Sequence, residues 1–189
     1  MPGFIDSHVH TVDFGQEIRS INAVAELYST IADLQRAIRE KAKSGGTWKG
    51  RILGRNYESN RMAERRWPTR EELDAAASEN LMMIAIREDH SCVVNSKALE
   101  LSEITKDTQE PEGGVIGNNP ATGEPTGVLA DAVDLVGRAI PKLTVEEIKK
   151  GIIEAGQAYM KLRITSTGDA GAESRPESYR AYQEALQEA

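Results

Sequence analysis

The sequence predicts an α/β fold that opens like a (β/α)8 barrel, with a large mixed α+β insertion after the first barrel strand. A short apolar strand pattern at Phe4–Ser7 begins the chain. A strongly amphipathic helix pattern runs from Val145 to Leu162, and a β-branched strand pattern follows at Ile164–Thr167. Strand, helix and strand in this order are typical of parallel α/β folds. The residues between them, 11–141, carry strand and helix patterns of their own, so we interpret them as an insertion.

Composition indicates a globular protein of one domain. The 189 residues are 39% hydrophobic and 28% charged, which is ordinary for a domain with its own core. We expect this domain to consist of three stretches. Residues 1–10 hold the first barrel strand, 11–141 the insertion, and 142–189 the next helix, a second barrel strand and a last helix.

Charge and cysteine content exclude several classes of protein. The net charge of −7 argues against nucleic acid or an anionic membrane as the main partner. The single cysteine, Cys92, excludes an internal disulfide framework and fits a reducing compartment. The N-terminus lacks a signal-peptide pattern, and no apolar run approaches the ~20 residues of a membrane helix. We therefore expect a cytoplasmic protein.

The first strand leads into two histidines with one residue between them. In the stretch PGFIDSHVH, His8 and His10 follow the strand Phe4–Ser7. Residues i and i+2 of a strand point to the same face, so both imidazoles can aim at one point beyond the strand end. Two imidazoles on one face are a typical half of a divalent-metal site. The alternative is a pair of histidines on a solvated strand face.

The first half of the insertion contains one helix and one strand between polar segments. Residues 11–22 form no clear pattern, and we expect a loop with a short strand. Thr30 is placed to cap a helix that carries apolar residues at helical spacing and ends at Gly45–Gly46. A strand is expected at Arg51–Arg55. The basic stretch Arg61–Arg70 is interpreted as a solvated loop, with a site for an anionic substrate as the alternative.

The middle of the insertion predicts helix, strand and helix. Thr69 and Glu72 form a capping box for a helix that runs through Ala77. The apolar run Leu81–Ile86 does not alternate, which predicts a strand that is buried on both faces. Asn95 is well placed to cap a helix from Ser96 to about Leu101.

Turn residues and capping signals define the remaining elements. Gly113–Gly117 and Pro125–Leu129 are predicted to form a β-hairpin, and a helix should follow at 130–140. A second capping box, Thr144 with Glu147, begins the amphipathic helix that ends near Leu162. A last amphipathic helix begins near Ser174.

Several of these stretches together resemble one branch of the amidohydrolase superfamily, amidohydrolase family 3. This branch includes YtcJ-type proteins, N-substituted formamide deformylases and the AepA-type exoenzyme regulatory proteins. The matching stretches are PGFIDSHVH, RILGRNY, PTREELDAAA, EDHSCVVNSKALEL, GEPTGVLAD and RITSTGDAG, and they occur in the family order.

The resemblance implies a metal-dependent hydrolase of carbon–nitrogen bonds, with amides or N-substituted formamides as substrates. His8 and His10 would be the metal ligands on the first strand, and zinc the expected divalent metal. His90 and Asn95 match positions where the family usually carries the same residues, and Asp169 lies at the end of the next barrel strand, so the resemblance makes these three residues candidates for a place near the substrate. For Asn95 the alternative is a plain helix cap, and for His90 a hydrogen-bonded loop or core histidine. Gly168 stands where the family often has a histidine.

The resemblance also shows what these residues lack. The family's lysine motif, its further metal-binding histidines and its late catalytic aspartate do not occur in residues 1–189, so no catalytic residue is identified. We therefore expect an incomplete amidohydrolase domain that needs a C-terminal part or a further copy of the chain, with a small amide as substrate. The competing hypothesis is a non-catalytic regulatory or interaction protein derived from an amidohydrolase.

Overall fold

The computed structural model describes residues 2–44, 50–87, 90–140, 142–171 and 176–187. The chain folds into two compact units, which are described separately. The first unit combines Met1–Arg19 with Lys142–Ala189, and the second unit is Ser20–Pro141. Residues 11–19, at the start of the stretch interpreted as the insertion, thus belong to the first unit.

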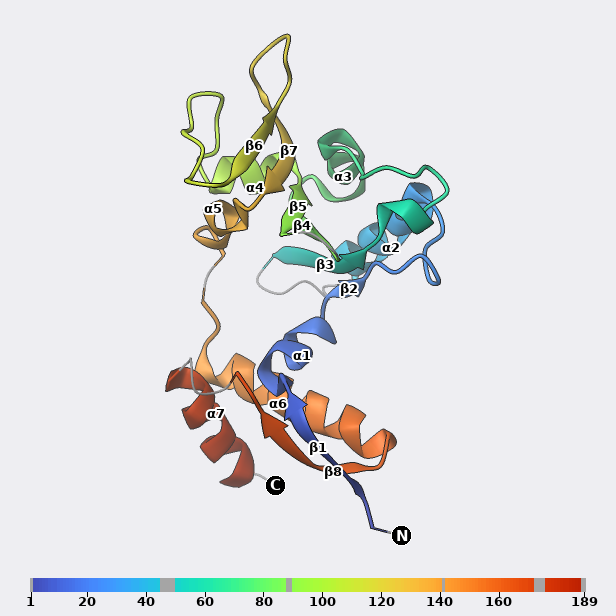
Figure 1. Cartoon of the computed structure of the whole chain (residues 1–189), viewed down its shortest axis with the longest axis vertical. Coiled ribbons are helices and arrows are strands. Elements are labelled where there is room, and N and C mark those ends of the chain that lie inside the picture. The colour runs from blue at the N-terminus through green and yellow to red at the C-terminus, as the bar shows by residue number, and fades with distance from the viewer. Residues whose placement is uncertain (1, 45–49, 88–89, 141, 172–175, 188–189) are drawn as a thin grey trace. The chain divides into compact units, whose positions relative to one another are not determined.

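The first unit is a two-stranded parallel sheet packed with three helices (Figure 1). Its elements are β1 (Phe4–Val9), α1 (Thr11–Glu17), α6 (Val145–Lys161), β8 (Ile164–Asp169) and α7 (Pro176–Gln187). β1 pairs with β8 in parallel, with Val9 opposite Asp169. The core of the unit contains Val12, Ile148, Ile152 and Ala181. The strand–helix–strand order expected for the ends of the chain is therefore present.

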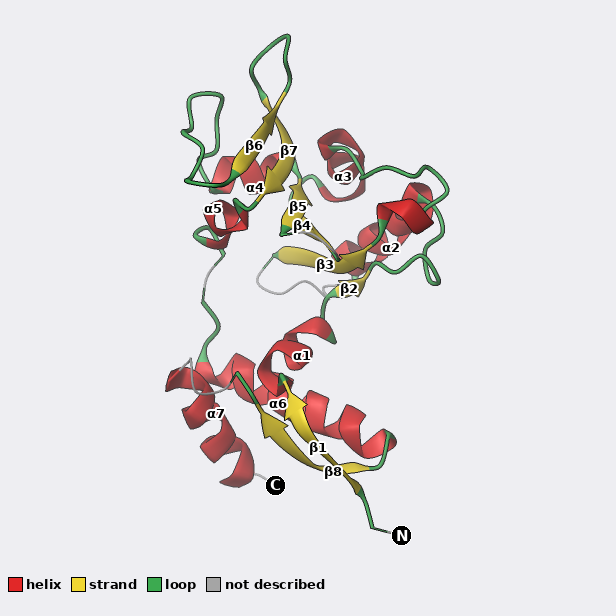
Figure 2. Ribbon diagram, viewed as in Figure 1, coloured by secondary structure: helices red, strands yellow, loops and turns green. Residues whose placement is uncertain are grey.

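The second unit is built on a six-stranded mixed sheet (Figure 2). In spatial order its strands are β2 (Ile21–Asn22), β3 (Arg51–Tyr57), β4 (Leu81–Ile86), β5 (Ser91–Val94), β7 (Pro125–Ala130) and β6 (Val115–Asn118). β2, β3 and β4 are parallel, and the pairs from β4 through β5 and β7 to β6 are antiparallel. Its helices are α2 (Ile31–Lys43), the 3-10 turn Ser59–Arg61, α3 (Arg70–Ala77), α4 (Ser96–Leu101) and α5 (Val133–Gly137).

Helices cover both faces of this sheet. On β4, Met82 and Ile84 join a core cluster with residues of α2 and α3. The alternate residues Leu81 and Met83 join a second cluster with residues of α4 and α5. Because successive strand residues point to opposite faces, β4 is buried on both sides, as its continuous apolar pattern predicts.

Helices with a capping signal form where the sequence predicts them. The Thr30 side chain caps α2, both capping boxes are complete at the starts of α3 and α6, and the predicted hairpin is β6–β7. Gly45–Gly46 and residues 174–175 lie outside the described residues. These helix starts are confirmed because a cap involves side chains and amides only three residues apart.

Two expectations about local structure are wrong, and one strand was not predicted. Residues 11–17, expected in a loop, form α1, and Ser91–Val94 forms the unpredicted strand β5. The helix expected at 130–140 is reduced to α5, because Ala130 still belongs to β7. At each of these places, partners distant in the sequence determine the local structure.

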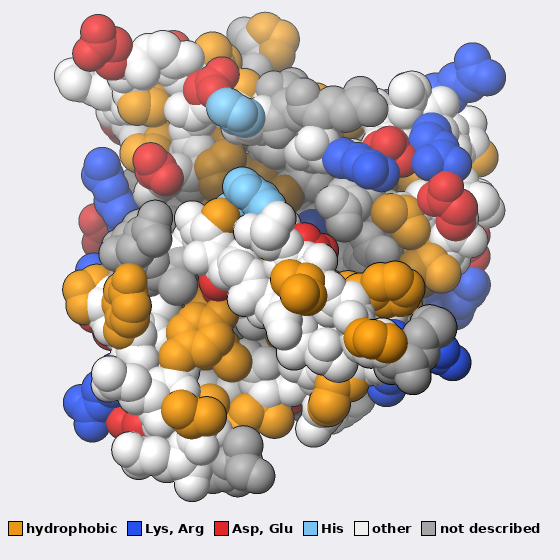
Figure 3. All heavy atoms as spheres, turned by 60° about the horizontal axis from the view of Figure 1, so that its bottom comes forward, with side chains coloured by type: hydrophobic (Ala, Val, Ile, Leu, Met, Phe, Trp, Pro, Cys, Tyr) orange, Lys and Arg blue, Asp and Glu red, His pale blue; other side chains and the backbone are white. Residues whose placement is uncertain are grey.

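The sheet of the first unit leaves much of its apolar surface exposed. Phe4 and Ile5 of β1 are 58% and 78% exposed, and Leu162, just before β8, is 67% exposed. Figure 3, which turns the lower end of Figure 1 toward the viewer, shows such hydrophobic side chains on the surface in orange. The described residues form no closed barrel. Among their helices, none combines the length and apolar character that crossing a membrane requires.

We expect Cys92 to be unreactive in the folded chain. Its side chain is fully buried in β5, and burial raises the pKa of the thiol to about 12. Since the thiolate is the reactive form, a disulfide reagent should modify the native chain at least about 100-fold more slowly than the urea-unfolded chain. Absorbance of the released chromophore measures both rates, and equal rates would contradict the burial of β5.

Candidate metal centre

The first strand brings its two histidines to one end of the parallel sheet. His8 is near the end of β1, and His10 directly follows it. Both side chains are exposed, and their ring centroids are 5.3 Å apart at an interplanar angle of 84°. Two imidazoles bound to one zinc ion, with Zn–N distances of about 2.0–2.1 Å and tetrahedral geometry, have centroids roughly 5 Å apart. The distance between the two ring centroids therefore matches that of two imidazoles on one ion.

Asp169 lies at the same end of the sheet as the two histidines. It ends β8 and is the register partner of Val9, between the two histidines in the sequence. The amide of Ala170 donates to the carbonyl oxygen of Val9 at 2.9 Å, which ties the turn after β8 to the end of β1. Parallel strands end at a common edge, so Asp169 lies at the same end of the sheet as the two histidines.

Both carboxylate oxygens of Asp169 accept hydrogen bonds. Oδ1 accepts from the amide of Gly171 at 3.0 Å, and Oδ2 accepts from the hydroxyl of Tyr182 at 2.5 Å. Burial, reinforced by the hydrogen bond to Asp169, raises the pKa of the Tyr182 hydroxyl well above its usual value. The phenol therefore stays protonated and acts as a hydrogen-bond donor across the physiological pH range. No feature of the sequence singled out Tyr182.

The histidine pair has no third ligand within reach in the described part of the chain. No group of three or more histidine, cysteine, aspartate or glutamate side chains is arranged there to hold a metal ion. Asp6, which precedes the pair on β1, uses its Oδ1 to accept from the amide of His8 at 3.2 Å. The described residues thus supply two donors of a metal site that would need at least one more.

His90 lies in the second unit, at the start of β5. Its side chain is 91% exposed, and its Nδ1 is 3.3 Å from the carboxylate of Asp131. The backbone carbonyl of His90 accepts from the amide of Asp131 at 3.0 Å. Residues 88–89, which begin the family-like stretch, lie outside the described residues. His90 is thus a solvent-exposed loop histidine that, among the described residues, lies beside the carboxylate of Asp131.

Asn95 is fully buried in the second unit and engages its whole side-chain amide. Its Oδ1 accepts from the amides of Met82 and Ala98, each at 3.0 Å, and so caps α4. Its Nδ2 donates to the carbonyl oxygens of Ala77 and Asn80, at 3.0 and 2.9 Å. These contacts join α3, β4 and α4, and they accord with the helix-cap alternative for this residue.

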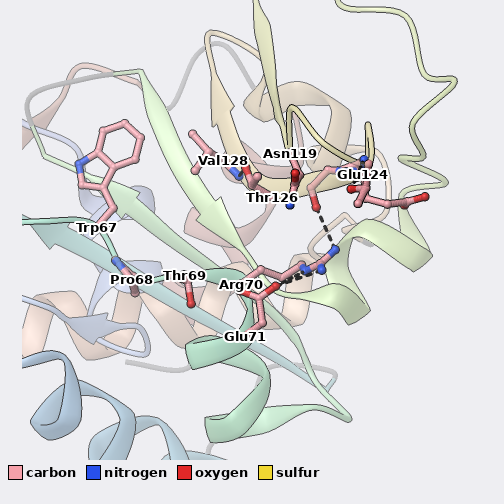
Figure 4. A pocket seen from close by; sticks show the side chains of 11 residues that line it. Trp67, Pro68, Thr69, Arg70, Glu71, Asn119, Glu124, Thr126 and Val128 are labelled. Atoms are coloured by element: carbon pink, nitrogen blue, oxygen red, sulfur yellow. Dashed lines mark hydrogen bonds and ion pairs between the residues drawn. The ribbon is translucent and has the colours of Figure 1, made fainter.

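The second unit also contains a cavity of about 570 Å³ between the start of α3 and the hairpin β6–β7 (Figure 4). Trp67, Pro125 and Val128 contribute apolar walls. The guanidinium of Arg70 donates to the carbonyl oxygen of Pro125 at 2.9 Å and to the carboxylate of Glu71 at 3.0 Å. The lining includes Trp67–Arg70, the end of the stretch whose alternative was an anionic-substrate site, but none of the candidate metal ligands or near-site residues. The guanidinium of Arg70, which lines this cavity, thus already has hydrogen-bond partners within the chain.

The basic stretch Arg61–Arg70 forms ion pairs with nearby acidic side chains. Arg61 contacts the carboxylates of Glu26 and Glu58, and Arg66 makes two bonds to Glu72, the shorter at 2.7 Å. These ion pairs on the surface of the unit give the clustered arginines partners within the chain.

A comparison with families of known proteins gives one match over the whole chain. The model of the amidohydrolase family matches residues 1–189. The chain belongs to the amidohydrolase family. The membership inferred from the six short stretches is thereby confirmed, including the segment that carries His8 and His10.

Named relatives cover most of this chain with about 30% identity. A protein named as an amidohydrolase, YtcJ of Bacillus subtilis (strain 168), is 31% identical over 156 residues, which are 82% of this chain and 28% of YtcJ. An N-substituted formamide deformylase of Arthrobacter pascens is 32% identical over 134 residues, 70% of this chain and 24% of the deformylase. The protein LONG AFTER FAR-RED 3 of Arabidopsis thaliana is 28% identical over 90% of this chain and 29% of its own length.

Two solved structures share the fold of the chain. Both are described as uncharacterized metal-dependent hydrolases, from Pyrococcus horikoshii OT3 and Pyrococcus furiosus. Each has a TM-score of 0.69 and 23% identity over the whole chain, which spans 34% and 35% of those proteins. At this identity the likeness concerns the fold. The chain spans about a third or less of the length of these relatives and solved structures.

Proposed function

We propose that this chain supplies the first part of a metal-dependent amidohydrolase that hydrolyses non-peptide C–N bonds, of the amide or N-substituted formamide type. The observation that carries the proposal is the pair His8 and His10, with rings 5.3 Å apart at the carboxyl end of β1. Family membership over residues 1–189 supports the reaction class. The name of the Arthrobacter relative, a deformylase of N-substituted formamides, supports the substrate class.

In this proposal β1 and β8 are neighbouring strands of a (β/α)8 barrel, with the second unit inserted between them. Their parallel pairing and the helix α6 that precedes β8 support this assignment. Enzymes with this barrel carry their active sites at the carboxyl ends of the strands, where His8, His10 and Asp169 lie. Phe4 and Ile5, whose apolar side chains are exposed, would then be covered by other parts of a complete barrel.

His8 and His10 fit a divalent cation that prefers nitrogen ligands, and zinc is the ion we propose. The chemistry that such a cation supplies is Lewis acidity, which polarises a carbonyl group and activates water. The two imidazoles would bind the cation and fix its position at the strand ends. Asp169, with both oxygens already bonded, would orient its neighbours. The remaining ligands and the proton-transferring group are assigned to parts outside these residues.

A non-catalytic regulatory or interaction protein is the second candidate. The observation that favours it is that the described residues hold no group of three metal ligands. A catalytic zinc site normally uses three protein ligands and one open position. Two imidazoles alone bind an ion weakly and leave it exchangeable, so the isolated chain would have little activity under either candidate.

Replacing His8 by alanine should abolish most of the zinc binding of the chain. We expect the affinity, measured by competition with a chromophoric chelator, to fall at least about tenfold, because one of the two nitrogen donors is removed. His10→Ala should have the same effect. His90→Ala is the matched control, since His90 is an exposed histidine in the second unit, and it should leave the affinity unchanged. A folded wild-type chain that binds no zinc would favour the non-catalytic candidate.

A further inference from the structure

The turn after β8 lies against the imidazole of His10. Gly171 is close enough that a Cβ atom added to it would be 3.1 Å from Nδ1 of His10 and 3.8 Å from Oδ1 of Asp169. The next nearest atom of the ring is Cε1, at 3.9 Å, so the Nδ1 edge of the ring faces the turn. Nε2 is therefore the ring nitrogen that the turn leaves available to an ion.

The position of this turn is fixed by Asp169. Its Oδ1 accepts from the amide of Gly171, which closes the turn on the carboxylate of its first residue. The amide of Ala170 donates to the carbonyl oxygen of Val9, which fixes the turn to the strand that ends beside His10. A rotation of the Asp169 side chain would break the first of these bonds and loosen the end of the turn that lies beside the His10 ring.

Tyr182 in turn fixes the side chain of Asp169. Its hydroxyl donates to Oδ2 at 2.5 Å, and it belongs to α7, which packs on the core of the unit through Ala181. A hydrogen bond to a carboxylate is among the stronger kinds in proteins. The aromatic ring has few rotatable bonds and is half-buried, so it holds the carboxylate oxygen that the turn does not use.

We propose that Tyr182 is a positioning residue, which acts through Asp169 and the Asp169–Gly171 turn to orient the imidazole of His10. That the oriented imidazole binds an ion rests on the proposed function, whereas the orientation itself does not require an ion. In metal sites the groups that orient a ligating histidine affect affinity by about 10–100-fold. Gly171 belongs to the same arrangement, because a side chain at this position would be in close contact with Nδ1 of His10.

Each carboxylate oxygen of Asp169 already has one hydrogen-bond donor within the chain. Here one oxygen is bonded to the amide of Gly171 and the other to the hydroxyl of Tyr182. The carboxylate links α7 to the strand ends.

Nuclear magnetic resonance of the imidazoles tests the orientation without any metal. The chain has three histidines, so long-range proton–nitrogen spectra should contain three imidazole systems, each assigned by its alanine variant. In Tyr182→Phe we expect the His10 signals to shift and those of His8 and His90 to move much less. Tyr179→Phe is the matched control on the same helix. Its side chain is exposed, and all three systems should stay in place.

Two further variants separate positioning from a general loss of structure. Asp169→Asn should shift the His10 signals, and adding Tyr182→Phe to it should change them little further, since both act through one carboxylate. Gly171→Ala leaves Tyr182 and Asp169 in place and should also shift the His10 signals. It therefore tests the contact of the turn with the ring if Tyr182→Phe does not fold.

Zinc affinity is the second measurement, made by chelator competition on the same variants. We expect Tyr182→Phe to weaken binding by about tenfold and Tyr179→Phe to leave it unchanged. A wild-type chain without zinc binding would contradict the proposed function, and the imidazole spectra would still decide the positioning role. Folded Tyr182→Phe and Gly171→Ala variants with wild-type His10 signals would overturn the inference.

Discussion

Replacing Gly15 with alanine is expected to destabilise the first unit by about 2 kcal/mol, whereas the same change at Gly151 should be neutral or stabilising. Gly15 is on α1, and Gly151 faces it from α6. A Cβ atom on Gly15 would be 2.5 Å from the backbone C and O atoms of Gly151. Because backbone atoms of a helix interior cannot move independently, the two helices would have to separate, which typically costs about 1–3 kcal/mol or more.

Alanine at position 151 causes no such backbone clash. A Cβ atom on Gly151 would be 3.4 Å from the nearest backbone atom of Gly15, an ordinary van der Waals distance. Alanine in a helix interior is favoured over glycine by roughly 0.5–1 kcal/mol. The opposite signs follow from the direction in which each Cα–Cβ bond points, although both glycines lie at one crossing.

Urea unfolding and hydrogen exchange of the amides in α1 and α6 measure this difference. Gly15→Ala should accelerate exchange in both helices and lower the unfolding midpoint, because the separation also disturbs the stacked rings of Phe14 and Tyr159, whose centroids are 5.4 Å apart. Arg19, two residues after the end of α1, also bonds to Glu154 of α6, and the shorter of the two bonds is 2.7 Å. Equal effects of the two alanine variants would show that α1 and α6 do not cross at these glycines.

The same crossing explains why α1 could not be predicted from the sequence. Its seven residues include a glycine and two β-branched residues, and no side chain caps its N-terminus. A helix this short is not stable by itself in water and depends on tertiary packing. The packing partner, α6, begins more than 120 residues later in the chain. The helices α3 and α6 were predictable because Thr69 with Glu72, and Thr144 with Glu147, are local signals.

The candidate metal centre was partly predictable for a similar reason. The spacing of His8 and His10 fixes their common face once β1 is a strand, and the βαβ order places Asp169 at the same edge. Tyr182 follows from neither rule. It reaches Asp169 because α7 turns back onto the unit, and a tyrosine on the inner side of an amphipathic helix is usually only a core residue.

Replacing Asn95 with alanine is expected to cost about 3–5 kcal/mol of folding stability, the upper range for a single substitution. The side chain is fully buried and bonded at all four of its amide positions. Alanine would leave two backbone amides and two carbonyl oxygens without these partners in the interior. Ser96→Ala is the matched control, since it removes only an exposed bond to Asp74 at 2.6 Å and should cost about 1 kcal/mol or less.

Asn95→Asp separates the role of the two donors from that of the cap. An aspartate keeps the acceptor for the amides of Met82 and Ala98, but it faces the carbonyl oxygens of Ala77 and Asn80 with a second oxygen where Asn95 has two donors. Burial and these oxygens disfavour the charged form, so its pKa in the folded variant should exceed the unfolded value of about 3.9. The stability of the variant relative to wild type should then be highest below pH 4 and decrease as the pH rises.

Urea unfolding at pH 4 and pH 7 measures both Asn95 variants. The near-site role that the family resemblance suggests for Asn95 predicts a different pattern from the one expected here. A residue that mainly contacts substrate would tolerate alanine with a loss of about 1 kcal/mol or less, because its amide would not be saturated within the fold. The four bonds of Asn95 require the larger loss and the pH dependence of the aspartate variant, since they join the end of α3, the start of β4 and the first turn of α4 through one side chain.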